Sequence, residues 1–235
     1  MDHNDWNIIK TSQLFSAMED EWIHQLIRAS RQVTYVKKTT LFQQGDSADM
    51  FFLILSGWVK VFRVTASGEE AVIGVFTEGE TIAENAMFMG GQYPACATTV
   101  TDTRIVKIDG QALRNMIRSN PDVAFALLAA SSRHQRYLVD QIEQIKVLPG
   151  SRRVANFLVK LCPQGRGQYN LELPYEKALI AARPGMKPES FSRALAKLRP
   201  LGVSTSQDQL AISDIETLAI YAETGKNNHR NLPGS

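Results

Sequence analysis

The sequence contains little cysteine, no long apolar run and little net charge, and each of these absences excludes a class of protein. Two cysteines, Cys96 and Cys162, cannot form a disulfide framework or a tetrahedral metal site made only of cysteines. The longest unbroken apolar stretch covers residues 123–130, far fewer than the roughly 20 residues of a membrane-spanning helix. The polar and acidic first five residues lack the basic start and apolar run of a secretory signal. We therefore expect a globular protein in the reducing cytoplasm.

The small net charge of +2 conceals an uneven distribution of charge along the 235 residues. Residues 1–150 hold 14 Lys and Arg against 17 Asp and Glu, whereas residues 151–235 hold 12 against 7. Within residues 151–203 the balance is 10 basic against 3 acidic residues. This segment is either a module that binds a polyanion such as nucleic acid or a solvated basic face.

The first half of the chain predicts a helical start and then a small β-barrel or roll. Apolar residues recur at helical spacing at Trp22, Ile23, Leu26 and Ile27. Five short runs rich in β-branched or aromatic residues follow, mostly separated by Gly- or Asp-containing turns, at residues 33–36, 51–55, 58–64, 71–76 and 104–108. We interpret them as closely spaced antiparallel strands.

Two helices are expected after the strands. Asp109 is a candidate N-cap for a helix over residues 111–119, and Asn120-Pro121 ends it and begins a second helix that extends to about Val147. The second helix carries the three- and four-residue steps of a coiled-coil seam at Leu128, Ser131, Gln135, Leu138, Ile142 and Ile145. The seam predicts a homodimer interface; the alternative is a long helix that packs on its own domain.

The region after Pro149-Gly150 has the element order of a winged helix-turn-helix. The sequence predicts, in order, a helix over 151–161, a strand over 169–173, a helix over 175–183, a turn at Pro184-Gly185, a helix over 188–198 and a closing hairpin over 203–212. The last residues, 224–235, are rich in Gly and Asn and predict a flexible tail.

The segment 187–198 carries the most specific chemistry. As a helix it would bury Phe191, Ala194, Leu195 and Leu198 and leave Glu189, Ser192, Arg193 and Lys197 outward. Arg can bind the major-groove edge of guanine through two hydrogen bonds, Glu can accept from cytosine, and Ser can serve either kind of edge. Glu189 and Arg193 could instead form an ion pair along the helix. Its position after a Pro-Gly turn in the basic segment favours base reading, with Lys187, Ser190 and Lys197 as candidates for contacts to the DNA backbone.

Over roughly residues 10–222 the chain resembles the CRP/FNR family of bacterial transcription regulators. The resemblance rests on Phe42-Gln43-Gln44-Gly45-Asp46, Leu55-Ser56-Gly57-Trp58-Val59-Lys60-Val61, Gly79-Glu80, the long central helix and Glu189-Ser190-Phe191-Ser192-Arg193. Glu-x-x-Ser-Arg is the signature of the FNR branch and implies a palindrome with half-sites like TTGAT. Pro188 stands where the CRP branch has an Arg, so readout by that Arg is not implied.

The resemblance implies a cyclic-nucleotide-type β-roll with a ligand pocket at Glu84, Asn85, Pro94 and Ala95. Glu84 matches the Glu that bonds the ribose in nucleotide-binding members, but Pro94-Ala95 replaces the Arg-Ser pair that holds the cyclic phosphate. A phosphate without this Arg loses charge-assisted hydrogen bonds of about 1.5–3 kcal/mol each. We therefore expect that cyclic AMP does not bind. The amino terminus has no cysteine cluster, which excludes the iron-sulfur form of the family.

Three segments, residues 84–89, 127–129 and 189–193, look most similar to the Dnr/NnrR branch of the family. This resemblance implies a nitric oxide signal sensed through haem. Haem needs an axial ligand. The histidine candidates are His24 and His134, because His3 and His229 lie in the expected tails, and Met and Cys are the other options. Haem is thus a hypothesis, and another small ligand or cyclic nucleotide is the alternative. An activator would also contact RNA polymerase.

The expected protein is an α+β regulator and not an enzyme. It has a sensor domain over residues 1–120, a dimerisation helix over 121–148, a winged helix-turn-helix over 149–223 and a tail over 224–235. No phosphate-binding loop, zinc-protease motif or nucleophile elbow occurs in the sequence. A second interpretation is a ligand-binding protein whose helix-turn-helix contacts another protein. Salt dependence separates the two, since DNA binding weakens steeply with salt.

Overall fold

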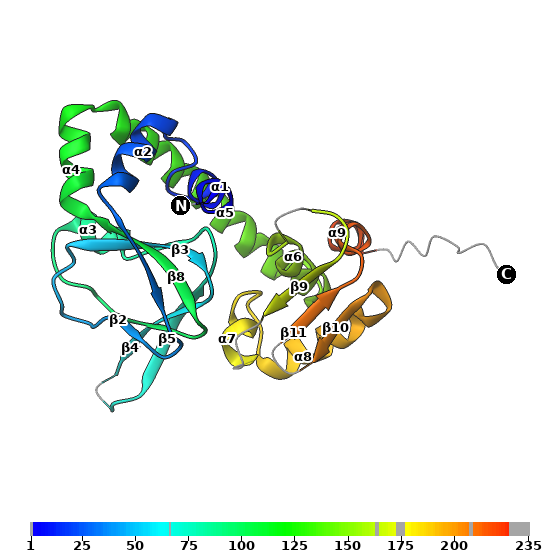
Figure 1. The fold of residues 1–235 in the computed structure, drawn as a ribbon. Coiled ribbons are helices and arrows are strands. Elements are labelled where there is room, and N and C mark those ends of the chain that lie inside the picture. The colour runs from blue at the N-terminus through cyan, green and yellow to red at the C-terminus, as the bar shows by residue number, and fades with distance from the viewer. Residues whose placement is uncertain (1, 66, 163–164, 173–176, 207–208, 226–235) are drawn as a thin grey trace. The chain divides into compact units, whose positions relative to one another are not determined.

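The computed structural model describes residues 2–65, 67–162, 165–172, 177–206 and 209–225 (Figure 1). The chain divides into two compact units between Val139 and Asp140. This division lies within the long central helix, before the boundary that Pro149-Gly150 predicts. Among the described residues, no helix combines the length and the apolar character needed to cross a membrane.

The first unit is a β-roll covered by helices. Its sheets are wholly antiparallel, with strand orders β1-β8-β3-β6 and β2-β7-β4-β5. The strands are β1 (Arg31–Tyr35), β2 (Thr40–Phe42), β3 (Met50–Ser56), β4 (Val59–Val64), β5 (Glu70–Phe76), β6 (Thr81–Ile82), β7 (Cys96–Thr99) and β8 (Thr103–Asp109). The five strands that the sequence predicts are confirmed. The other three, β2, β6 and β7, have only two to four residues, too few to show a periodic pattern.

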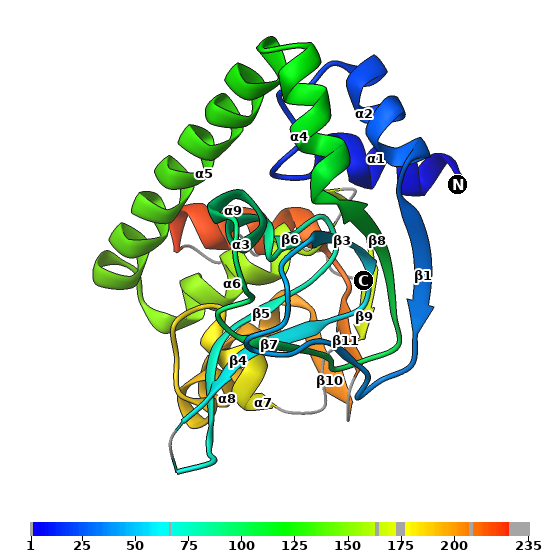
Figure 2. The same ribbon diagram turned by 90° about the vertical axis from the view of Figure 1, so that its left-hand side faces the viewer.

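Helices pack on one face of the first sheet. They are α1 (His3–Thr11), α2 (Asp20–Arg28), α3 (Glu84–Met89), α4 (Gly110–Ser119) and α5 (Asp122–Val147), and Figure 2 shows α1, α2 and α4 grouped at one end of the roll. Ile9, Ile23, Leu113 and Val123 from the helices pack into one core with residues of β3 and β8. A second core lies in the roll and joins residues of both sheets, among them Phe42, Phe52, Val59 and Ile105.

Two predictions about the helices are confirmed. The carboxylate of Asp109 accepts a hydrogen bond from the backbone N–H of Gln111 at 2.7 Å and so caps α4. The second expected helix is α5, which ends at Val147.

The second unit has the winged helix-turn-helix order. It contains α6 (Gly150–Lys160), β9 (Tyr169–Glu172), α7 (Lys177–Ala182), α8 (Pro188–Leu198), a 3₁₀ turn η1 (Arg199–Leu201), β10 (Val203–Ser206), β11 (Gln209–Ile212) and α9 (Ile215–Thr224). The strand order is β10-β11-β9, so the expected hairpin is completed by β9. The expectation that the hairpin closes the module was wrong, because α9 follows it and packs on α6. Asp214 caps this helix by accepting from the Thr217 N–H at 3.0 Å. The tail beyond residue 225 lies outside the described residues.

Candidate nucleic-acid interface and β-roll ligand site

Helix α8 forms where the sequence predicts it. Pro188 occupies the first turn, where a residue without an N–H loses no helical hydrogen bond. Glu189 lies near the positive end of the helix dipole and Lys197 near the negative end, so both charges stabilise the helix. Phe191, Ala194 and Leu198 are buried, as expected, whereas Leu195 is only half-buried. The apolar stripe anchors the helix and fixes which residues it presents to solvent.

The predicted readers lie on the exposed side of α8. Glu189, Ser192 and Arg193 are all exposed, as are Lys187 and Lys197, and Ser190 is half-buried. Arg193 donates from Nη2 to the hydroxyl of Ser190 at 3.4 Å, a long contact at the solvent edge. Among the ion pairs of the described residues, none joins Glu189 to Arg193. The guanidinium of Arg193 and the carboxylate of Glu189 are therefore both exposed to solvent and not paired with each other.

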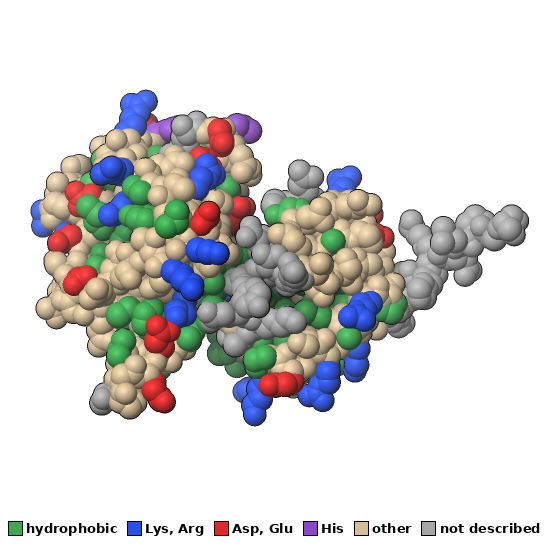
Figure 3. Space-filling view, turned by 60° about the horizontal axis from the view of Figure 1, so that its bottom comes forward, with side chains coloured by type: hydrophobic (Ala, Val, Ile, Leu, Met, Phe, Trp, Pro, Cys, Tyr) green, Lys and Arg blue, Asp and Glu red, His purple; other side chains and the backbone are tan. Residues whose placement is uncertain are grey.

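Exposed basic side chains lie on α8 and at both of its ends, on the surface of the second unit. Figure 3 shows Lys and Arg side chains along the lower edge of that unit, with acidic side chains between them. Lys187, Arg193, Lys197 and Arg199 are the exposed basic residues of α8 and its two ends. Arg199, at the start of η1, is a candidate phosphate contact that the sequence analysis did not single out.

The four predicted ligand-pocket residues differ in their exposure to solvent. Glu84 begins α3 and is half-buried, Asn85 beside it is exposed, and Pro94 is exposed while Ala95 is buried just before β7. Ala83 holds a left-handed conformation with φ of 70° to make the bend from β6 into α3. This conformation is uncommon for a residue other than glycine.

The carboxylate of Glu84 is a buried polar group of the roll. Its Oε2 is buried and has no hydrogen-bond partner among the described residues. Burial raises the pKa of Glu84 above its usual 4.5, while hydrogen bonds from its own backbone and from Thr81 partly oppose the rise. A desolvated acceptor of this kind suits a ligand that donates an O–H or N–H.

The loop that carries Pro94 contains no Lys or Arg, but the guanidinium of Arg63 from strand β4 contacts it. Arg63 of β4 donates from Nε to the carbonyl of Pro94 at 3.1 Å, and both residues are exposed. Inside the roll the neighbouring Tyr93 stacks on Phe42 with ring centroids 4.1 Å apart and donates its hydroxyl to the carbonyl of Met50 at 2.7 Å. Sequence reasoning missed this aromatic packing, because Phe42 and Tyr93 are 51 positions apart and only the fold brings them together.

The predicted dimer seam lies on the open surface of α5. Leu128, Leu138 and Ile142 are 62%, 45% and 54% exposed. Ser131 and Gln135 are also exposed, and the side chain of Ile145 lies outside the described residues. The exposure of this apolar stripe is unusual for a helix that packs only on its own domain.

The histidines differ in their surroundings. His24 is exposed on α2 and stacks face to face on Trp6 with ring centroids 3.8 Å apart. His134 is half-buried on α5; burial lowers its pKa below the usual 6.5, while Glu80 acts in the opposite direction. His3 belongs to α1, so the expectation that it lies in a tail was wrong. Within the described part of the chain, no three His, Cys, Asp or Glu residues gather as a metal site would require.

The two cysteines are not equivalent. Cys162 is buried; burial raises its pKa to about 11, and its thiol donates to the Leu158 carbonyl at 3.2 Å. Cys96 is only half-buried and accepts from the Gln44 N–H at 3.3 Å.

Comparison with known proteins agrees with this architecture. Residues 32–120 match the family model of the cyclic nucleotide-binding domain, and residues 152–221 match the Crp-like helix-turn-helix domain. The chain is similar to a crystal structure from Ruegeria pomeroyi of a candidate cyclic nucleotide binding protein, with 36% identity, a TM-score of 0.87, and coverage of 95% of this chain and all of that one. It is similar to DNR from Pseudomonas aeruginosa with 28% identity, a TM-score of 0.58, and coverage of 94% and 99%.

A curated relative gives the same picture from sequence alone. The chain is 27% identical over 217 residues to the CRP-like cAMP-activated global transcriptional regulator of Mycobacterium tuberculosis, which covers 90% of this chain and 97% of the relative.

Proposed function

Because the chain belongs to the CRP/FNR family of transcription regulators, we propose that it acts as a homodimer on an FNR-like DNA palindrome. The observation that carries this proposal is the exposed polar face of α8, where Glu189, Ser192 and Arg193 project from a helix anchored by Phe191 and Leu198. Each copy would place its α8 in the major groove of one half-site, and the half-sites of such dimers lie about one helical turn apart.

The three outward residues supply a distinct reading chemistry. Arg193 would donate two hydrogen bonds to a guanine, Glu189 would accept from the amino group of a cytosine, and Ser192 would bond either kind of edge. This set fits half-sites like TTGAT. Lys187, Ser190 and Lys197 would contact phosphates and so fix the position of the helix without reading sequence.

The test is fluorescence anisotropy with a labelled duplex that carries TTGAT and ATCAA half-sites, compared with a scrambled duplex. We expect tighter binding to the palindrome and a steep loss of affinity with rising salt on both duplexes. Equal affinity for the two duplexes overturns the proposed operator. Binding of neither, together with salt-insensitive binding to a protein partner, overturns the assignment of this face to DNA.

We also propose that the first unit senses a small signal and that haem is one carrier of it. His134 could bind the haem iron, because its imidazole is half-buried on α5 and burial lowers its pKa, which favours the neutral form in which His binds metals. His24 fits poorly, since its ring is stacked on Trp6. Bound haem would supply an iron that takes up nitric oxide. What the chain contributes is a ligand on α5, the helix that also carries the dimer seam, so a change at His134 could shift the equilibrium between active and inactive dimers.

Absorption spectroscopy tests the haem proposal. Titration of ferrous haem into the full chain should give a shifted Soret band that responds to nitric oxide, and His134→Ala should lose it while His24→Ala keeps it. No shift with the wild-type chain overturns haem as the carrier.

The second candidate is a polar small ligand other than haem, favoured by the buried, unpartnered Oε2 of Glu84. Cyclic AMP fits this site poorly, because Pro94 and Ala95 offer no charged group for its phosphate and the exposed Arg63 nearby already donates to the carbonyl of Pro94. Calorimetry with cyclic AMP should therefore show no binding, and micromolar affinity overturns that expectation.

A further inference from the structure

Two adjacent arginines in the first turn of α6 make the same kind of contact to different elements. Arg152 donates from Nε to the carbonyl of Ala222 at 3.1 Å and from Nη2 to the carbonyl of Glu223, at the end of α9. Arg153 donates from Nη1 to the carbonyls of Pro184 at 3.0 Å and Gly185 at 3.2 Å. Arg152 thus holds the end of α9, and Arg153 holds the Pro184-Gly185 turn that leads into α8.

The turn held by Arg153 also packs directly on the start of α6. A Cβ added to Gly150 would lie 2.6 Å from the Cε of Met186, so the glycine permits this close approach. The turn is compact, because the Met186 N–H bonds the Ala181 carbonyl at 2.9 Å and Gly185 has φ of +66°. Only two residues separate Gly185 from Pro188, the first residue of α8. Any movement of the turn therefore moves the start of the recognition helix.

We propose that Arg153 is a positioning residue for DNA recognition, which holds the Pro184-Gly185 turn so that α8 presents Glu189 and Arg193 at a fixed angle. The inference rests on the proposed function, since it assigns Arg153 a role in reading bases. Arg153 is itself half-buried, and both of its hydrogen bonds are made inside the unit. It acts through the turn and does not touch a base.

The chemistry of the contact favours a charged donor. Two carbonyls converge on one nitrogen of a guanidinium, and hydrogen bonds from a charged group are stronger than neutral ones. The Nε of Arg153 is buried and has no partner among the described residues. Lysine has no counterpart to this nitrogen, and its ammonium group carries three donors at a single point. Arg153→Lys can thus keep the contact to both carbonyls.

The test compares Arg153→Gln with Arg152→Gln and Arg153→Lys in the full chain. Arg152→Gln is the matched control, because it removes the same kind of group from the neighbouring position and from the same helix turn. For each folded variant, affinity is measured on the palindromic and the scrambled duplex over a range of salt concentrations, and amide hydrogen exchange is followed by NMR.

Arg153→Gln should weaken binding to the palindrome about tenfold, leave the scrambled duplex within twofold of wild type, and keep the slope of affinity against salt. A lost phosphate contact would instead weaken both duplexes and reduce the slope by about one. Of the three variants, only Arg153→Gln should show faster hydrogen exchange at the Met186 amide than wild type. Arg152→Gln should affect the Gly225 amide, which bonds the Tyr221 carbonyl at 2.8 Å, and should read the palindrome normally. Arg153→Lys should restore the preference for the palindrome.

The inference is wrong if Arg153→Gln keeps wild-type discrimination while the wild-type chain prefers the palindrome, and in that case the proposed function stands. A matching loss of discrimination in Arg152→Gln also overturns it, because general loosening of the unit then explains both. If the wild-type chain itself shows no preference between the duplexes, the proposed function fails and the role of Arg153 in base reading fails with it.

Discussion

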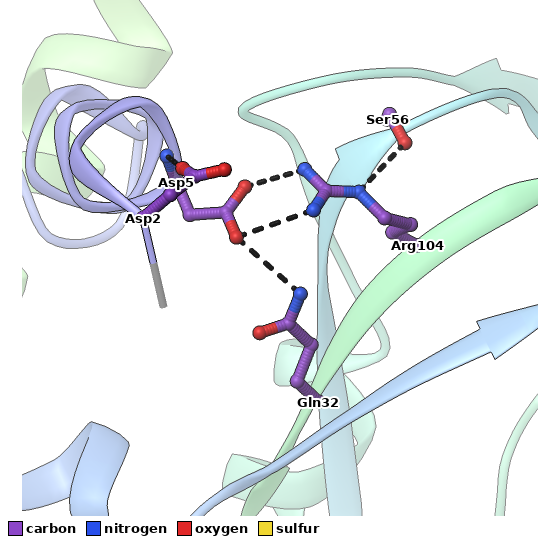
Figure 4. Close-up of polar contacts among 5 residues, drawn as sticks. All are labelled: Asp2, Asp5, Gln32, Ser56 and Arg104. Carbon is purple, nitrogen blue, oxygen red and sulfur yellow. Dashed lines mark hydrogen bonds and ion pairs between the residues drawn. The ribbon is translucent and has the colours of Figure 1, made fainter.

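The carboxylate of Asp5 on α1 forms an ion pair with the guanidinium of Arg104 on β8, ninety-nine positions away in the chain (Figure 4). The Asp5 side chain is only 2% exposed, whereas that of Arg104 is 34% exposed. Gln32 of β1 donates to the same carboxylate at 3.3 Å, and Ser56 of β3 accepts from the Nε of Arg104 at 3.4 Å. The pair therefore fastens the first helix of the chain to three strands of one sheet.

The unequal burial of this pair predicts unequal effects of two substitutions that each remove one charge, Arg104→Gln and Asp5→Asn. Arg104→Gln leaves a buried carboxylate without its cation and should reduce the free energy of unfolding by about 3 kcal/mol. Asp5→Asn leaves an arginine that can turn toward water and should reduce it by about 1 kcal/mol. Urea unfolding, followed through the transition of the first unit, measures the free energy of unfolding of both variants.

The double variant provides the control for this first prediction. If the two residues interact as described, the loss in Asp5→Asn/Arg104→Gln should be smaller than the sum of the single losses, by about 1–2 kcal/mol. Additive losses would contradict the pairing.

The buried carboxylate of Glu84 predicts that stability falls as the pH rises. Because burial raises the pKa of Glu84 above 4.5, the folded chain binds more protons than the unfolded chain between 4.5 and the raised value. Stability is therefore lost as the pH rises through that interval, and the penalty is complete above it. Glu84→Gln removes the charge, so this variant should be more stable than wild type at pH 7.5, and the advantage should vanish below pH 4.5.

Thermal unfolding of both chains from pH 4 to pH 8 checks this sign. The pKa of Glu78 is also raised by burial, but Glu78 is present in both chains and cancels in the difference. A variant that is less stable than wild type at every pH would show that the Glu84 carboxylate makes a stabilising contact.

Base reading by Arg193 can be separated from phosphate contact by Lys187. Arg193→Ala should weaken binding to the palindrome by about 1–3 kcal/mol and relax the preference at one base pair. Lys187→Ala should weaken the palindromic and scrambled duplexes about equally and lower the salt slope by about one. Anisotropy on duplexes with single base changes measures both effects, and equal losses on both duplexes in Arg193→Ala would assign Arg193 to phosphate.

The sequence predicts those parts of the molecule that a local pattern determines. The buried face of α8 follows from the helical spacing of Phe191, Ala194 and Leu198, and the start of α4 follows from the hydrogen bond that Asp109 can make two residues ahead. Contacts between distant positions carry no such signal. The bond from Arg153 to Pro184 spans 31 positions and depends on the packing of α6 against the turn.

The two-residue strand β6 and the left-handed Ala83 show a second limit of sequence patterns. Strand β6 is too short to show a pattern, and alanine is not a residue type that indicates a left-handed conformation. Pairing with β3 imposes the first conformation, and the start of α3 imposes the second. These features nevertheless position Glu84, so the ligand site is less predictable than the DNA-reading helix.

The exposed seam of α5 predicts that the chain dimerises through this helix. Burying a Leu or Ile side chain fully contributes about 1.5–3 kcal/mol relative to leaving it in water, and Leu128, Leu138 and Ile142 offer three such side chains per copy. Ile142→Glu places a charge in the seam and should convert the dimer to a monomer of 26.2 kDa in analytical ultracentrifugation. Arg136→Glu also changes the charge of an exposed position, but on another face of α5, and should remain dimeric. Because one reading helix then binds alone, monomeric Ile142→Glu should lose its preference for two half-sites over one. A dimeric Ile142→Glu would place the interface elsewhere.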